Sequence, residues 1–238
     1  KEKATHKDLN RSAEKQSSLA ATVRGNVIAR ELGFVNLTCL YVDSNNLKKI
    51  PAEIGTLSHL ERLTLSNNSL SSLPPEMGAL QRLHSLHLAN NSLTELPAPL
   101  CQLRSLTFLD VSDNKIGTIP SSIRHLEKLE TLLLLFNSLE SLPEEVCLLR
   151  KLRTLWLGNN HLRSLPATFG ELVNLDWGYN YCSCNFEGNP LERPPPEPKI
   201  SLLSTVFYIQ HTGCVGSGFH LALDKNQPVS RSHKVSRK

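Results

Sequence analysis

Cysteine and histidine residues near the C-terminal end of the chain are the first candidates for chemistry. Cys182, Cys184, His211, Cys214 and His220 all carry side chains that can bind zinc. Structural zinc sites usually use pairs of cysteines separated by two residues, whereas this set begins with a C-x-C pair in an irregular stretch. We therefore interpret these residues as structural or incidental, and we expect no metal ion.

The glycine-rich stretch GCVGSG at 213–218 is the second candidate. A phosphate-binding loop would continue into a helix, often through a G-K-S/T motif, and neither feature follows here. No Ser/His/Asp set and no pair of carboxylates stands out in the rest of the sequence. We therefore predict a protein that is not an enzyme and that needs no cofactor.

Charge is distributed unevenly along the 238 residues. The formal net charge is +4, with +5 at 225–238 and +3 at 1–24, which leaves −4 for the body between them. An acidic body does not favour a nucleic-acid groove, so we expect no nucleic-acid partner. A basic tail such as KNQPVSRSHKVSRK can touch anionic membranes, but it is more often solvated and disordered. No apolar stretch outside the repeats described next is long enough to span a bilayer.

Asparagines recur at a constant spacing through the middle of the chain. Each lies in the pattern L-x-x-L-x-L-x-x-N-x-L-x-x-L-P, in which Val or Ile replaces some leucines, as in LERLTLSNNSLSSLP at 60–74. Six copies in unbroken register indicate a repeat architecture. The repeated asparagines are Asn45, Asn68, Asn91, Asn114, Asn137 and Asn160.

The repeated pattern predicts a short strand followed by a return segment. Leu63 and Leu65 are two residues apart, so both side chains face the same side of a strand. Stacked copies form a parallel sheet, and returns such as AEIGTLSHL (52–60) are too short for long helices. No single copy can bury its leucines without its neighbours. The asparagine amide both donates and accepts hydrogen bonds, which predicts a ladder of asparagines along the stack.

This pattern resembles the leucine-rich repeat family over roughly residues 26 to 192. The return IPAEIGTLSHL (50–60) is similar to the intracellular 23-residue branch, which includes Ras-suppressor-like and scribble-like proteins. The resemblance implies an α/β solenoid, a horseshoe with a concave parallel β-sheet and short helical or 3₁₀ turns on the convex side. It also implies that a protein partner of unknown identity binds the concave sheet.

The ends of the repeat pattern divide the chain into three segments. We expect a polar, disordered segment at 1–24, the solenoid at 25–192, and an irregular segment with a basic tail at 193–238. A half repeat at 27–37 opens the solenoid, and a seventh, irregular repeat ends it, because Asn189 follows Asn160 at a longer spacing than the regular copies have. The extra residues fall within 176–184, either as a functional loop or as an irregular stretch of sequence.

The cellular setting follows from weaker signals. Six scattered cysteines suit a reducing compartment, and we expect no signal peptide, because the first residues lack a charged segment followed by an apolar one. We therefore expect a cytoplasmic adaptor or signalling regulator. An extracellular ligand-recognition domain is one alternative, favoured only by N-x-S/T sequons at Asn36, Asn67 and Asn90. A targeting subunit of a phosphatase or ubiquitin-ligase assembly is the other.

Apolar residues replace polar ones on the predicted concave face of repeats four to six. In the fifth repeat, Leu133, Leu135 and Phe136 occupy positions that are mostly polar or small elsewhere, and the leucines at 129, 132, 134 and 139 are assigned to the core. A contiguous exposed apolar patch usually marks an interface. Two alternatives stay open: Phe136 packs into the core, or the C-terminal segment covers the patch. The predicted partner-binding residues are Phe108, Leu133, Leu135, Phe136, Trp156 and, further along the same face, Tyr41.

Overall fold

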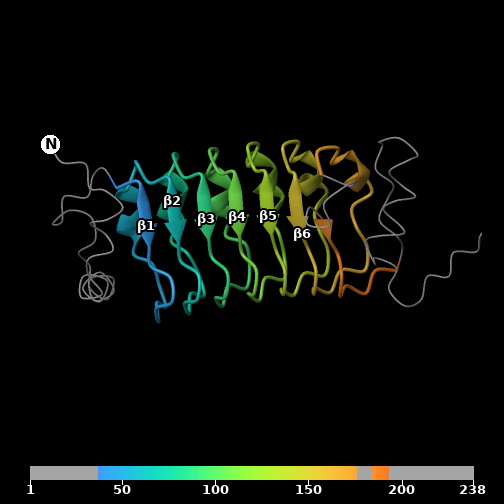
Figure 1. The fold of residues 1–238 in the computed structure, drawn as a ribbon, viewed down its shortest axis with the longest axis horizontal. Helices are drawn as coiled ribbons and strands as arrows, with labels where there is room; N and C mark the ends of the chain where they lie inside the picture. The colour runs from blue at the N-terminus through green and yellow to red at the C-terminus, as the bar shows by residue number, and fades with distance from the viewer. Residues whose placement is uncertain (1–36, 176–183, 193–238) are drawn as a thin grey trace, which may run out of the picture.

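The computed structural model describes residues 37–175 and 184–192. In this part of the chain, seven short parallel strands lie side by side in chain order in one open sheet (Figure 1). The predicted parallel-sheet solenoid is therefore confirmed. The segments predicted at 1–24 and 193–238, and all but the last residue of the half repeat, lie outside the described residues. The strands are β1 (Cys39–Tyr41), β2 (Arg62–Thr64), β3 (Ser85–His87), β4 (Phe108–Asp110), β5 (Thr131–Leu133), β6 (Thr154–Trp156) and β7 (Cys184–Asn185).

A 3₁₀ helix lies in each return segment between consecutive strands. Five of the six begin directly after a proline in extended conformation, such as Pro51 before η1. Proline fixes φ and has no N–H to donate, so it separates the strand side of each repeat from its helical turn. The short turns expected from the sequence are thus 3₁₀ helices. They are η1 (Ala52–Thr56), η2 (Pro75–Ala79), η3 (Ala98–Gln102), η4 (Ser121–His125), η5 (Glu144–Leu148) and η6 (Phe169–Glu171).

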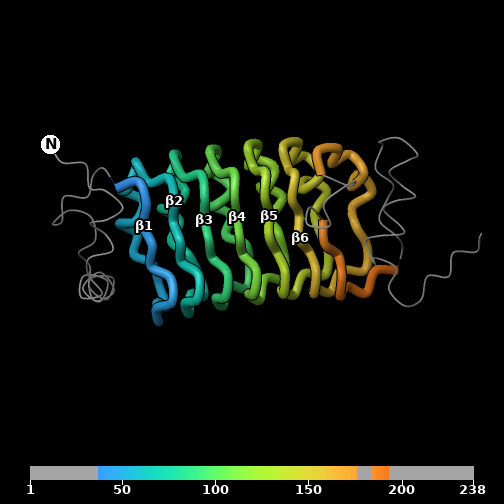
Figure 2. Tube along the Cα trace, in the orientation of Figure 1, coloured from blue at the N-terminus to red at the C-terminus, as the bar shows by residue number. Residues whose placement is uncertain are grey.

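The strands pair in a register that follows the sequence repeat. Leu40 pairs with Leu63, the equivalent leucine of the next copy, and one regular repeat separates the partners in every neighbouring pair from β1 to β6. The last step along the chain is longer, because Leu155 pairs with Cys184. The tube in Figure 2 shows the resulting coils stacked along one axis. The extra residues of the seventh repeat therefore enter before β7 without ending the sheet, and 176–183 lie outside the described residues.

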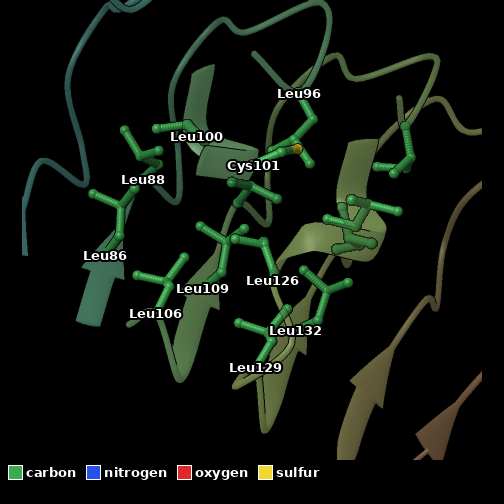
Figure 3. Close-up of a cluster of buried hydrophobic side chains, with 14 of the residues drawn as sticks. Leu86, Leu88, Leu96, Leu100, Cys101, Leu106, Leu109, Leu126, Leu129 and Leu132 are labelled. Carbon is green, nitrogen blue, oxygen red and sulfur yellow. The ribbon is translucent and has the colours of Figure 1, made fainter. Parts of the chain in front are cut away.

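The leucines of the repeat fill the space between the sheet and the 3₁₀ helices. In the close-up of Figure 3, Leu109 of β4 points toward Cys101 of η3, and Leu106 lies beside it. The four leucines at 129, 132, 134 and 139, assigned to the core from the sequence, are fully buried. Full burial of a leucine stabilises a fold by roughly 1.5–3 kcal/mol, so this continuous core supplies most of the driving force.

The repeated asparagines form the predicted ladder. Nδ2 of Asn114 donates to the carbonyl oxygens of Val111 in its own repeat (3.1 Å) and of Leu88 in the preceding one (3.0 Å). Its Oδ1 accepts from the backbone N–H of Leu93 at 3.0 Å. Asn189 continues the ladder, since its Nδ2 donates to the carbonyl of Leu157 at 2.8 Å. Buried backbone groups of one repeat are thus satisfied by the side chain of the next.

Asn114→Leu is expected to destabilise the solenoid. Leucine has the same branched side-chain skeleton but cannot replace the amide, so the N–H of Leu93 loses its buried acceptor, and the carbonyl of Leu88 keeps only Nδ2 of Asn91. An unsatisfied buried group costs about 1–3 kcal/mol. Urea unfolding followed by circular dichroism measures the change. Asp113→Asn, in the same turn but exposed, is the matched control and should leave the urea midpoint of unfolding unchanged. An unchanged midpoint for Asn114→Leu would contradict the asparagine ladder.

Candidate functional site

The residues that alternate with the core leucines lie on the outward face of the sheet, called here the sheet face. It is the predicted concave face. Its central row, running from β1 to β7, places one residue of each strand beside the next. A second row follows two residues later along the chain, and a third directly after that. The central row is Tyr41, Thr64, His87, Asp110, Leu133, Trp156 and Asn185.

Leu133, Leu135, Phe136 and Trp156 form one contiguous cluster on this face, named here the apolar patch. Leu133 and Trp156 are direct strand partners on β5 and β6. Partners in neighbouring strands lie about 4.8 Å apart, which is contact distance for two large side chains. Leu135 follows in the second row, and Phe136 in the third. The structure therefore brings together four of the six residues predicted from the sequence.

Phe136 is the most exposed member of the patch, with 54% of its surface accessible. The alternative that this ring packs into the core is therefore wrong. Its φ of +52° lies in the left-handed region. In the equivalent turns of the other repeats this conformation is adopted by Asn, Asp, Ser or Gly, and Asn and Asp tolerate it better than bulky residues do. A large exposed apolar residue in an unfavourable backbone conformation points to a function rather than to a packing role.

Gly158 supports the patch through its lack of a side chain. A Cβ at this position would lie 3.1 Å from Cδ2 of Leu135 and 2.8 Å from Oδ1 of Asn185. These two side chains therefore pack over the bare backbone of Gly158, between the patch and β7. The sequence analysis did not predict Asn185 as part of this surface. The longer spacing of the seventh repeat, counted from Trp156, would have placed Asn185 in the central row.

Phe108 lies at the border of the patch. Its ring centroid is 4.6 Å from that of His87, so it stacks toward β3 rather than over β5. Burial lowers the pKa of His87 below its usual value, although the nearby Asp110 opposes this effect. This effect favours the neutral imidazole, and the Phe108–His87 pair extends the apolar surface by one strand.

Tyr41, the sixth predicted residue, lies apart from the patch. It is 42% exposed on β1, four strands from Leu133, or about 19 Å. Its hydroxyl accepts a hydrogen bond from Nη1 of Arg62 at 3.4 Å. On the neighbouring strand, Thr64 is buried and donates to the carboxylate of Asp43. The N-terminal half of the sheet face is thus polar and internally hydrogen-bonded.

Carboxylates flank the apolar patch on both sides. Asp110 is the strand partner of Leu133, and Asp113 occupies the position beside Phe136 in the preceding repeat. Glu187 follows β7 on the other side, and its backbone carbonyl lies next to Gly158. We name Asp110, Asp113 and Glu187 the flanking acids. One oxygen of Asp110 accepts from the backbone N–H of Ser112 at 3.0 Å, which fixes the side chain in place.

No metal site or membrane span is found in the described ranges. Among residues 37–175 and 184–192, no group of three His, Cys, Asp or Glu is placed to hold a metal ion. None of the helices in these ranges has the length and apolar character needed to cross a bilayer. Of the residues first considered for zinc, Cys184 lies in β7, and the other four lie outside the described residues, as does the GCVGSG stretch.

Comparison with known proteins identifies the repeat. The model of the leucine-rich repeat region matches residues 32–137, and a second leucine-rich repeat model matches 151–172. This chain is a leucine-rich repeat protein. Such a domain indicates a protein–protein interaction module. No match was found among curated proteins.

Solved structures of leucine-rich repeat proteins are similar in fold. A Leptospira interrogans protein is 32% identical with a TM-score of 0.51, over 65% of this chain and 44% of that one. The ectodomain of the Arabidopsis thaliana membrane receptor kinase GASSHO1/SCHENGEN3, in complex with CASPARIAN STRIP INTEGRITY FACTOR 2, is 33% identical with a TM-score of 0.57, over 67% and 19%. A Listeria monocytogenes internalin is 25% identical with a TM-score of 0.56, over 67% and 45%. The chain thus spans less than half of each.

Exchanging Phe136 for asparagine or for alanine tests the backbone strain at this turn. Both variants remove the ring, but only asparagine suits the left-handed conformation. We expect Phe136→Asn to exceed Phe136→Ala in free energy of unfolding by about 1 kcal/mol. Urea titration of both variants measures the difference. Leu135→Asn and Leu135→Ala are the control, because Leu135 has no positive φ, and asparagine should give no such advantage there. Equal stability of the two Phe136 variants would show that the backbone at Phe136 is not strained.

Proposed function

We propose that this leucine-rich repeat protein is a non-enzymatic adaptor or regulator that binds a protein partner at the apolar patch. One observation carries the proposal: Phe136 is kept exposed in a left-handed turn where the other repeats have polar residues or glycine. The ring of this residue is exposed and does not pack in the core, which favours a contact beyond the described repeats, and we propose that a protein partner rather than the C-terminal segment provides it. Leu133, Leu135 and Trp156 surround the ring with further apolar area.

The composition of the patch suits protein binding better than catalysis. Interfaces concentrate their binding energy in a few aromatic anchors surrounded by smaller contacts, and tryptophan is among the commonest anchors. Trp156 is half-buried, with Leu133 beside it and Phe136 at the rim. The rigid sheet holds these side chains in one place before binding, which reduces the entropy lost when the partner docks.

We propose a cytoplasmic setting, supported by the scattered cysteines and the resemblance to the intracellular branch. The extracellular alternative also has an observation in its favour, because the sequon residues Asn67 and Asn90 are exposed on the third row. Their amides are hydrogen-bonded to each other at 2.8 Å, and a glycan on Asn90 would disturb this contact. Glycosidase treatment of native material separates the settings: a mobility shift favours the extracellular one. A targeting subunit of a larger enzyme assembly would use the same patch.

Substitutions in the patch test the proposed function. The partner is first identified by photo-crosslinking from a reactive amino acid at position 133 and mass spectrometry, and then purified. Trp156→Ala and Leu133→Glu should each weaken its binding by roughly 2–4 kcal/mol, because each removes or charges a central contact. Isothermal titration calorimetry measures the affinity, and thermal unfolding should stay nearly unchanged.

Tyr41→Ala is the matched control, since it removes an exposed aromatic ring from the same row at the other end of the sheet. It should leave the affinity at the patch unchanged. Full affinity of both Trp156→Ala and Leu133→Glu, with the fold intact, would rule out the apolar patch as the binding site.

A further inference from the structure

We propose that the segment which docks on the apolar patch is basic, with Lys or Arg on both sides of its own apolar residues. This inference rests on the proposed function and names the chemistry of the partner. It follows from charge complementarity, since the patch is apolar at its centre and acidic at both edges.

The flanking acids lie on opposite sides of the patch. Asp110 and Asp113 belong to the repeat of β4, and Glu187 to the repeat of β7. Three strand spacings separate these repeats, which is about 14 Å. An extended peptide covers that span in about four residues, and a helix in about nine. A short partner segment therefore reaches both edges while its apolar residues lie on Leu133, Phe136 and Trp156.

Cations of the described chain do not neutralise these acids. The two ion pairs in the described ranges, Arg150–Glu171 and Arg163–Glu192, involve none of them. The three rows of the sheet face contain no Lys or Arg, and the seven strands contain one, Arg62. It lies on β2 beside Tyr41. Arg153 precedes β6, and Glu130, at the equivalent position before β5, carries the opposite charge. Lys115, two residues after Asp113, is in neither of these ion pairs, so within the described ranges both edges of the patch carry carboxylates without an ion-pair partner.

The two kinds of contact have different consequences. The apolar residues supply affinity, whereas complementary charge at the edges accelerates association and rejects partners of the wrong sign. Asp43, the other acid of these rows, does not share this role, because it belongs to the repeat of β1, four strand spacings or about 19 Å from the repeat of β5. Selection for basic partners should therefore be confined to the C-terminal half of the sheet.

A phage-displayed library of random peptides, selected on the full chain, tests this inference. We expect the wild-type protein to enrich peptides in which Lys or Arg flank aromatic or aliphatic residues. The double variant Asp113→Asn/Glu187→Lys should lose this basic bias and still enrich apolar peptides. Asn suits the left-handed turn at 113, and Glu187 is exposed, so both changes are compatible with the fold. Glu76→Lys, an exposed acid in η2, is the matched control and should keep the basic bias.

A synthetic copy of the most enriched wild-type peptide gives the quantitative test. Its affinity by fluorescence anisotropy should fall about two- to fivefold for each charge altered, the range expected of solvent-exposed ion pairs, and should fall further with added salt. Apolar enrichment without a basic bias, or the same bias in the double variant, would overturn this inference and leave the proposed function standing. Peptides that bind Leu133→Glu as well as wild type, or no enrichment at all, would overturn both.

Discussion

The buried amide of one asparagine per repeat is the interaction on which the rest of this structure depends. From Asn68 onward, each amide donates to backbone carbonyls of its own repeat and of the preceding one, and accepts from a backbone N–H of the preceding repeat. Without it, the turn that follows each strand would bury unpaired polar groups against a core of leucine. The ladder thereby sets the distance and register between repeats, and the leucines pack within the limits that it imposes.

The same turn connects the fold to the proposed function. Bringing the asparagine side chain into the core requires the preceding residue to adopt a positive φ, which six non-glycine residues and Gly188 do in the described chain. That conformation directs the preceding side chain outward, on the rim of the sheet. A polar residue at this position is hydrated, whereas Phe136 exposes an apolar ring to solvent. The repeat therefore supplies a fixed outward position, and one repeat uses it for a residue that the fold itself does not favour.

The irregular seventh repeat contributes to the surface as well as to the end of the sheet. β7 resumes the register after the extra residues, which places Asn185 beside Trp156 and Glu187 beside Gly158. Gly158 gives Asn185 and Leu135 room to approach from opposite sides. The apolar patch is thus bounded by side chains from a repeat whose spacing departs from all others, and its acidic edge on that side comes from the same repeat.

The sequence by itself determined the periodic features of this protein. A constant period with leucines two apart identifies the strands, the core leucines and the asparagine ladder, because each repeat meets the same environment as its neighbours. It also placed Leu133, Leu135, Phe136 and Trp156 on one face. Only the tertiary structure decided what depends on contacts between particular neighbours. These include the 3₁₀ form of the turns, the left-handed backbone at Phe136, the stacking of Phe108 on His87, and the packing of Leu135 and Asn185 over Gly158. Such contacts depend on rotamers and close approaches that differ from repeat to repeat, and a periodic pattern carries no information about them.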